Sequence, residues 1–306
     1  MVDRIVSLIP SGTEIVSALG GADRLVGRSH ECDFPALVRS LPVCTSPKFD
    51  PSASSLEIDR SVRALVENAL SVYRVHEKTL QTLRPDVIVT QSQCEICAVS
   101  HSDVEASVAA VLDAETTIAS LEAVDLGGLW RDIQHVGEAI QTDSAGLIER
   151  LQSRLSEVRR DTTDGSRPRV FCLEWLEPMM FAGNWVPELI EMAGGEDLFA
   201  QSGAHSGVIS WDGVVSCDPD IIILMPCGYD LSRTLEEVPL LTNLPGWASL
   251  RAVRNGHVFA TDGNHYFNRP GPRLIESLEI LVEIMHPACR DHYGHRNTAW
   301  TPISTA

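Results

Sequence analysis

Two stretches of the sequence decide the fold: LRPDVIVTQSQCEIC at residues 83–97 and SCDPDIIILMPCGYD at residues 216–230. Each has a Pro-Asp pair near its start, then a short apolar run, and ends in a polar segment that contains cysteine. A nearly all-apolar run is typical of a parallel strand that helices cover on both faces. The two stretches therefore indicate an internal repeat of two α/β lobes.

Strand and helix patterns alternate on both sides of these stretches. RIVSLIPSGTEIVSALGG at 4–21 predicts a strand, a turn and a helix that Ser11 and Glu14 cap and Gly20 ends. The other main predicted strands are 116–121, 169–176, 220–226 and 257–262, and the predicted helices are 55–70, 76–83, 103–112, 186–195, 232–238 and 273–285. This alternation predicts an α/β protein with two Rossmann-like lobes.

A different pattern separates the lobes. Apolar residues recur every three or four positions from Leu129 to Val158, which predicts one long connecting helix over 126–162. The expected organisation is an N-terminal lobe at 1–125, this backbone helix, and a C-terminal lobe with a tail at 163–306. Ligands of such sheets bind beyond the carboxyl ends of the strands. We therefore expect a ligand cleft between the lobes.

Composition narrows the function. The 306 residues are 44% hydrophobic and 22% charged, as in an ordinary folded protein. A formal charge of -18 argues against nucleic acid as a partner. The first residues, MVDRIVSLIPSG, lack the pattern of a signal peptide and are too short an apolar run to insert in a membrane. The sequence as it stands predicts a cytoplasmic protein, or a periplasmic one if a leader has been removed.

The layout and several segments resemble the helical-backbone (class III) periplasmic binding proteins, which capture cobalamin, iron-siderophores and haem. The resemblance rests on RIVSLIPSGTEIVSALGGADRLVGRSHECDFP at 4–35 and on matching segments at 80–91, 188–200 and 218–226. CEICAVS at 94–100, LMPCGYDL at 224–231 and DGNHYFNRPGPRL at 262–274 are most similar to the cobalamin-binding branch. The resemblance implies non-catalytic capture of a corrinoid, or a related metal-bearing macrocycle or chelate, for delivery to an ABC importer permease.

Cys94 and Cys97 have four readings: packed buried thiols, a redox pair, part of a metal site, or direct contacts to a ligand. A metal site would need further ligands, and His30 and Cys32 follow a neighbouring strand. Three sulfurs and one imidazole nitrogen would suit zinc, and iron is a second candidate. The four residues also define the alternative function, a cytosolic metal-binding or thiol-dependent enzyme on the same fold.

Aromatic residues supply a second set of candidates, because several fall in loops just beyond predicted strands. Stacking on a flat macrocycle and packing between domains are both open readings for them. The complete set of predicted ligand contacts is Tyr73, Cys94, Glu95, Cys97, Trp175, Trp185, Trp211, Cys227, Tyr229, Asn264, His265, Tyr266 and Phe267.

The remaining polar candidates have weaker signals. Glu174 and Glu177 bracket Trp175 and could serve acid–base chemistry, bind a cation, or be solvated. His265 could ligate cobalt or iron, bond to an amide-rich ligand, or be solvated. The histidines at 205, 257, 286, 292 and 295 are expected on the surface. No nucleophile elbow, phosphate-binding glycine loop or HExxH motif is present, so catalysis is not required by the sequence.

Overall fold

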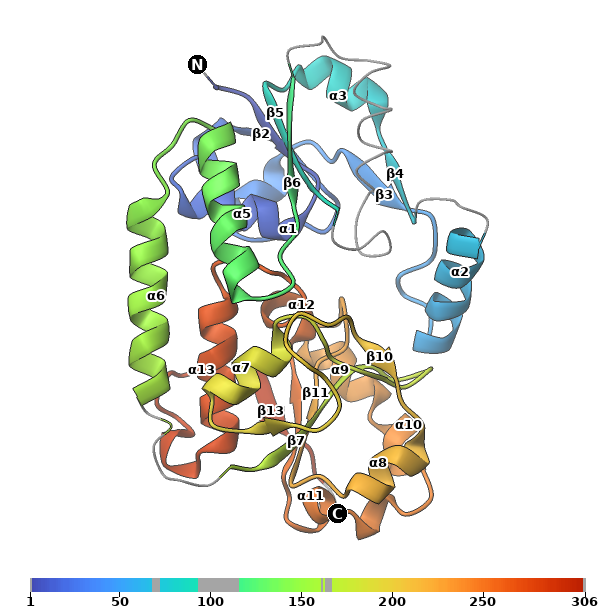
Figure 1. Cartoon of the computed structure of the whole chain (residues 1–306). Helices are drawn as coiled ribbons and strands as arrows, with labels where there is room; N and C mark the ends of the chain where they lie inside the picture. Colours follow the sequence, from blue (N-terminus) through green and yellow to red (C-terminus); the bar gives the residue numbers. More distant parts are fainter. Residues whose placement is uncertain (1, 68–71, 93–115, 161, 163–166, 305–306) are drawn as a thin grey trace. The chain divides into compact units, whose positions relative to one another are not determined.

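The computed structural model describes residues 2–67, 72–92, 116–160, 162 and 167–304. It forms two compact units, Met1–Arg150 and Leu151–Ala306, each with its own sheet (Figure 1). Both sheets have a parallel centre with helices packed against them. This confirms the predicted α/β fold of two lobes.

The first unit has a four-stranded parallel sheet in the order β2-β1-β5-β6. Its strands are β1 (Ile5–Ser7), β2 (Leu25–Arg28), β5 (Val87–Gln91) and β6 (Thr117–Leu121). All described neighbours in the sheet are parallel, so the loops that follow these strands meet at one edge. The predicted helix over 103–112 lies outside the described residues.

Two groups of elements cover this sheet. On one face, α1 (Pro10–Ala18) approaches β5 so closely that a Cβ at Gly12 would lie 2.6 Å from Val89 Cγ1. On the other face, Val6 and Ile88 belong to an apolar cluster with α3 (Glu77–Leu83) and with an antiparallel ribbon of β3 (Thr45–Pro47) and β4 (Tyr73–Val75). Partly buried residues of α2 (Ser55–Glu67) pack against that cluster.

The second unit has a seven-stranded mixed sheet. Its parallel centre consists of β7 (Arg169–Trp175), β11 (Ile221–Leu224) and β12 (Val258–Thr261). The antiparallel strands are β8 (Met180–Phe181), β10 (Gly207–Val208) and β13 (Trp300–Pro302), and β9 (Glu196–Asp197) pairs in parallel with β7.

Side-chain alternation assigns the helices of the second unit to the two faces of its sheet. Alternate residues such as Ile222 and Leu224 join an apolar cluster with α8 (Trp211–Cys217), α10 (Pro239–Thr242) and α11 (Arg251–Arg254). On the opposite face α7 (Val186–Met192) and α13 (Leu274–Met285) pack on each other. The short helices α9 (Leu231–Glu237) and α12 (Gly263–Tyr266) follow β11 and β12 at the carboxyl end of the sheet.

The predicted single helix over 126–162 is two helices in the structure. α5 (Leu126–Ala139) packs on β6 in the first unit, and α6 (Ala145–Arg160) contains the boundary between the units. Gln141 has a left-handed φ of 56°. Directly after it, Thr142 N donates to Gly137 O at 2.8 Å, so the chain turns back toward the end of α5.

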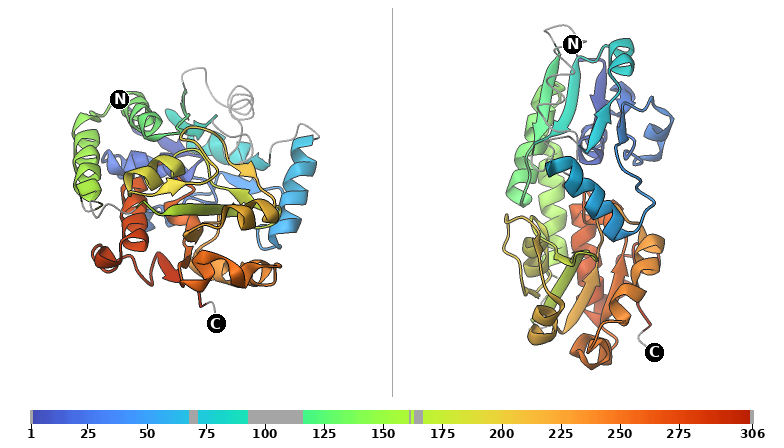
Figure 2. Two further views of the ribbon diagram at one scale, coloured as in Figure 1. Left: turned by 60° about the horizontal axis from the view of Figure 1, so that its bottom comes forward. Right: turned by 90° about the vertical axis from the view of Figure 1, so that its right-hand side faces the viewer.

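The second half of α6 lies beside α13 (Figures 1 and 2). Arg154 of α6 donates to the buried Glu279 of α13 through Nη2 at 2.6 Å and Nε at 2.8 Å. The segment after α13 is bound to the same helix, because Glu283 accepts from Tyr293 N, Gly294 N and Trp300 Nε1 at 2.7–2.8 Å. The tail is therefore an integral part of the second unit.

Candidate functional site

The first group of candidates lies where β2 ends. Residues 29–32 form a turn in which Cys32 N donates to Ser29 O at 3.3 Å. Arg28 Nη1 supports this turn by donating to the carbonyls of Ser29 at 2.9 Å and Cys32 at 3.2 Å. The turn directs the two predicted metal ligands, His30 and Cys32, toward different partners.

His30 bonds to the start of β3. Its Nδ1 lies 2.8 Å from Thr45 Oγ1, and its backbone N–H donates to the same oxygen at 3.1 Å. The pKa of His30 is lowered from 6.5 to about 4, mainly by burial and then by the neighbouring His76 and Arg28. The imidazole is therefore neutral at physiological pH.

Cys32 is buried inside the first unit. Its sulfur accepts from Thr13 Oγ1 at 3.0 Å and donates to Ser7 O at 3.9 Å, which places it against α1 and the end of β1. Cys94, Glu95 and Cys97 lie outside the described residues. Among the described residues, no three His, Cys, Asp or Glu side chains converge as a metal site would require. The four-ligand site therefore stays a prediction.

Tyr73, a predicted ligand contact, joins the His30 turn. Its hydroxyl donates to Glu31 Oε1 at 3.0 Å, and its ring lies 5.1 Å from the ring of His30 and 6.2 Å from that of Phe49. Glu31 Oε1 is also 4.0 Å from His30 Nε2. Sequence reasoning missed Glu31, although its place between His30 and Cys32 was a usable signal.

In the second unit, Trp175 and Tyr229 meet at the carboxyl end of the sheet. Their ring centroids are 5.4 Å apart, and the Arg233 guanidinium carbon lies 5.1 Å from the centre of the Tyr229 ring. Arg233 also pairs with Glu236 and Glu237 at 2.9 Å. Trp175 remains partly exposed. This aromatic pair is the strongest stacking candidate among the described residues.

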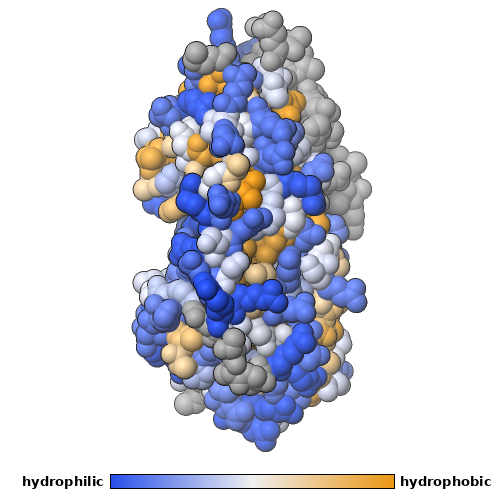
Figure 3. All heavy atoms as spheres, turned by 60° about the vertical axis from the view of Figure 1, so that its left-hand side comes forward, coloured by the Kyte–Doolittle hydropathy of each residue, from blue (hydrophilic) through white to orange (hydrophobic). Residues whose placement is uncertain are grey.

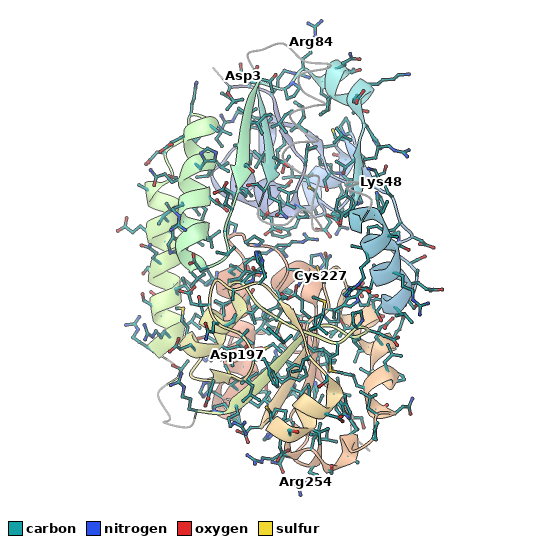
Figure 4. All side chains as sticks on the ribbon, turned by 45° about the vertical axis from the view of Figure 1, so that its right-hand side comes forward. Asp3, Lys48, Arg84, Asp197, Cys227 and Arg254 are labelled. Carbon is teal, nitrogen blue, oxygen red and sulfur yellow. The ribbon has the colours of Figure 1, made fainter. Side chains whose placement is uncertain are left out.

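Cys227 follows β11 next to this pair. Its backbone N–H donates to Glu174 O at 3.0 Å. Figure 4 shows Cys227 and Arg254 at opposite ends of the second unit, as expected for residues after β11 and before β12. In the first unit, Figure 4 shows Asp3 and Arg84 together at one end, with Lys48 away from them.

The loop that contains α12 is held by its own side chains. Asp262 accepts from His265 N at 2.8 Å and lies 2.7 Å from His265 Nδ1, while Arg269 Nη2 donates to Asn264 Oδ1 at 2.9 Å. Tyr266 lies 5.6 Å from the Arg273 guanidinium carbon. Asn264, His265 and Tyr266 are each half-buried.

Three of the predicted aromatic contacts, Trp185, Phe267 and Trp211, have partners within the second unit. Trp185 is buried and donates from Nε1 to the carbonyl of the buried Phe267 at 2.9 Å. Trp211 stacks on Trp247 at 6.1 Å and donates to Pro245 O at 2.7 Å, so its partners belong to the segment between α10 and α11.

Glu174, beside Trp175, is a half-buried polar candidate. Its carboxylate accepts from Ser206 Oγ, and burial raises its pKa more than the bonds from Ser206 and Gly183 lower it. Glu177 is exposed and its carbonyl accepts from Trp175 Nε1 at 3.1 Å. The two acidic residues therefore differ in environment, and Glu177 is the more exposed of them.

Two histidines predicted to lie on the surface are buried or paired. His286 is buried and its Nε2 lies 2.8 Å from Ala193 O. His295 Nε2 lies 2.8 Å from Glu279 Oε2. His286 thus joins the end of α13 to the end of α7, whereas His295 belongs to the packing of the tail on α13. The apolar helix pattern before them revealed neither contact.

Among the described residues, the face shown in Figure 3 has no large apolar patch that would compete with these candidates. That face is mainly hydrophilic, and its apolar residues form small separate groups. In the described part of the chain, every helix is too short or too polar to cross a membrane.

Comparison with known proteins gives a consistent result. A family model described as periplasmic binding protein matches residues 5–264. The uncharacterized ABC transporter substrate-binding lipoprotein YvrC of Bacillus subtilis is 22% identical over 295 residues, which cover 93% of this chain and 80% of that protein. The vitamin B12-binding protein of Vibrio cholerae is 25% identical over 285 residues, covering 90% and 87% of the two chains.

A solved structure extends the match to the fold. The periplasmic heme-binding protein RhuT of Roseiflexus has a TM-score of 0.69 at 21% identity, covering 94% of this chain and all of that one (100%). These comparisons contradict the predicted cytoplasmic location, because the relatives are described as a lipoprotein and as periplasmic. The prediction depended on the first residues alone, whereas the comparisons cover nearly the whole chain.

Proposed function

Because the chain belongs to the periplasmic binding protein family, we propose that it captures a corrinoid outside the cytoplasm for an ABC importer. Membership of a family of binding proteins confirms the prediction that the chain is not an enzyme. At this level it is a substrate-binding protein of the vitamin B12, haem or siderophore type. The choice of a corrinoid within that group is the proposal.

The observation that carries the proposal is the Trp175–Tyr229 pair. The two ring centroids are 5.4 Å apart and the rings are tilted by 54°. Tyr229 is buried behind the partly exposed Trp175 indole, which offers an apolar ring for stacking at the carboxyl end of the parallel strands. The vitamin B12-binding relative supports a corrinoid over other flat ligands. Cys227 and the half-buried residues of the α12 loop, Asn264 to Tyr266, are proposed as further contacts.

Nothing among the described residues favours the alternative of a metal- or thiol-dependent enzyme. His30 and Cys32 bond to different partners, and Cys44 and Cys172 are buried thiols whose pKa burial raises, to about 11 for Cys44. A raised thiol pKa reduces the thiolate fraction that nucleophilic chemistry needs.

Titration with cobalamin, cobinamide and haem, followed by absorbance and calorimetry, tests the proposal. We expect both corrinoids to bind and Trp175→Ala to weaken cobinamide binding by about 10-fold, because a stacked indole is lost. Trp211→Phe is the matched control, since Trp211 stacks on Trp247, and should leave the affinity unchanged. Binding of haem without either corrinoid would contradict the proposal.

A further inference from the structure

The tail after α13 contacts the α12 loop at the residue where the loop begins. β12 and β13 pair up to Thr261 and Trp300. The ladder continues one step further, because Asp262 N donates to the carbonyl of the buried Ala299 at 2.8 Å. Asp262 is also the N-cap of α12, since its side chain accepts from His265 N at 2.8 Å. The tail therefore fixes the position at which α12 starts.

A second contact of the tail reaches the last residue of α12. The ring of His295 lies 6.1 Å from the ring of Tyr266, at an angle of 65°. Tyr266 is also bound from α13, because Ser277 Oγ donates to its carbonyl. Asn264 and His265, two of the proposed ligand contacts, thus lie between the two points at which the tail touches the loop.

His295 is itself anchored to α13. Its side chain is 14% exposed, and its Nε2 lies 2.8 Å from Oε2 of Glu279, whose side chain is 3% exposed. A carboxylate only accepts hydrogen bonds, so Nε2 of His295 carries the hydrogen of this one. Arg154 of α6 binds the other oxygen of Glu279. With a partner on each oxygen, the buried carboxylate holds the histidine in one place.

Backbone bonds link His295 to the first contact. The carbonyl of His295 accepts from Ala299 N at 2.8 Å, which closes the segment between them into a turn. Glu283 accepts from Gly294 N at 2.8 Å and from Trp300 Nε1 at 2.7 Å, one on each side of this turn. The tail turn, residues 294–300, is therefore anchored to α13 at both ends and through His295.

We propose that the tail turn is a positioning element of the ligand site, which holds the α12 loop in its binding conformation before the ligand arrives. A loop that is already ordered loses less conformational freedom on binding, so the affinity is higher. His295 is the positioning residue: its bond to Glu279 anchors the turn, and the turn holds both ends of α12. This inference rests on the proposed function, in which the α12 loop contacts the ligand. The family model ends at residue 264, so the tail turn lies outside the matched part of the chain.

Hydrogen exchange of the ligand-free protein tests whether the tail turn orders the loop. His295→Ala removes the bond to Glu279 and the ring beside Tyr266, so a peptide covering residues 262–268 should exchange roughly 5-fold faster than in the wild type. Val253→Ala is the matched control. Val253 is buried in the apolar cluster of the second unit and precedes β12, at the end of the sheet away from α12. Its truncation lowers stability and should leave exchange of this peptide unchanged.

Titration with cobinamide tests whether that order serves binding. We expect His295→Ala to weaken cobinamide binding about 3- to 10-fold and Val253→Ala to leave it unchanged, although both variants should unfold at lower urea concentrations than the wild type. His295→Gln should restore the affinity to within about 2-fold, because its amide N–H can donate to Glu279 in place of the imidazole. His295→Phe, which has a ring but no donor, gives the same comparison if the alanine variant does not fold.

The proposal requires both effects. Wild-type exchange of residues 262–268 in His295→Ala overturns it, as does wild-type cobinamide affinity in that variant. An equal loss of affinity in Val253→Ala also overturns it, because the effect would then be one of stability alone. Failure of the wild type to bind any corrinoid overturns the proposed function and with it the role in binding, whereas faster exchange in His295→Ala would still show that the tail turn orders the loop.

Discussion

At the scale of single residues, His30 gives the chain a defined pH response. Its folded-state pKa of about 4 lies below the usual 6.5, so between these values the unfolded chain binds more protons than the folded one. The contribution of neutral His30 to stability is therefore fully present above pH 6.5 and is lost as the pH falls toward 4.

We expect an NMR titration to show His30 neutral down to a pH near 4. Urea unfolding across the same range should show the free energy of unfolding decreasing as the pH falls. In His30→Gln this decrease should be smaller, which separates the histidine from the many carboxylates. A His30 resonance that titrates near 6.5 would contradict the buried, neutral state.

At the residue scale, sequence spacing does not show the direction in which side chains point when the local backbone turns. His30 and Cys32 are two positions apart, which would place them on one face of a strand. β2 ends at Arg28 and residues 29–32 turn, so Cys32 instead packs against Ser7 and Thr13. Only the turn shows that Glu31, not Cys32, has its side chain beside His30.

At the scale of elements, apolar periodicity was sufficient for most strands and helices and insufficient for their ends. Ser11 was predicted to cap α1, but Pro10 occupies the first helical position and Ile9 is the N-cap without a side-chain bond. Likewise, Ile140 and Leu147 are seven residues apart, so the apolar period continues across the break between α5 and α6 and hides it. The missed signal was Asp143, whose carboxylate accepts from Ala145 N at 3.1 Å.

Asp132 of α5 shows how an element is held in place by a single side chain. Its carboxylate accepts from Glu122 N at 3.0 Å and from Ala123 N at 2.9 Å, joining the helix to the end of β6. We expect Asp132→Ala to lower the free energy of unfolding by about 2–3 kcal/mol, because two backbone donors lose their acceptor.

Chemical denaturation of Asp132→Ala and Gln134→Ala measures this effect on one helix. Gln134 is exposed and bonds only to Glu138 among the described contacts, so its loss should cost less than about 0.5 kcal/mol. Equal stability of the two variants would show that the junction of α5 and β6 does not depend on the carboxylate.

At the scale of the whole molecule, the tail completes the second unit. β13 adds an antiparallel edge to β12, and Trp300 is fully buried with its ring 5.6 Å from that of Phe259. The sequence predicted the helix over 273–285 as the last regular element, followed by a tail, because the residues after it have no apolar period. These tail residues are bound through Glu279 and Glu283, two acidic residues within an apolar helix. The groups that bind to the two glutamates lie in the tail, further along the chain.

Trp300→Ala should lower the free energy of unfolding by about 3–5 kcal/mol, because it leaves a cavity beside Phe259 and removes the N–H that Glu283 accepts. Since each unit has its own core, the loss should be confined to the second unit. Hydrogen exchange should therefore accelerate in peptides from β7, β11 and β12, while β5 of the first unit keeps its protection.

Phe34→Ala, which truncates an exposed ring, is the control and should change neither set of peptides. Equal acceleration in β5 and β12 would mean that the two units unfold as one cooperative body, and that the tail stabilises the whole chain.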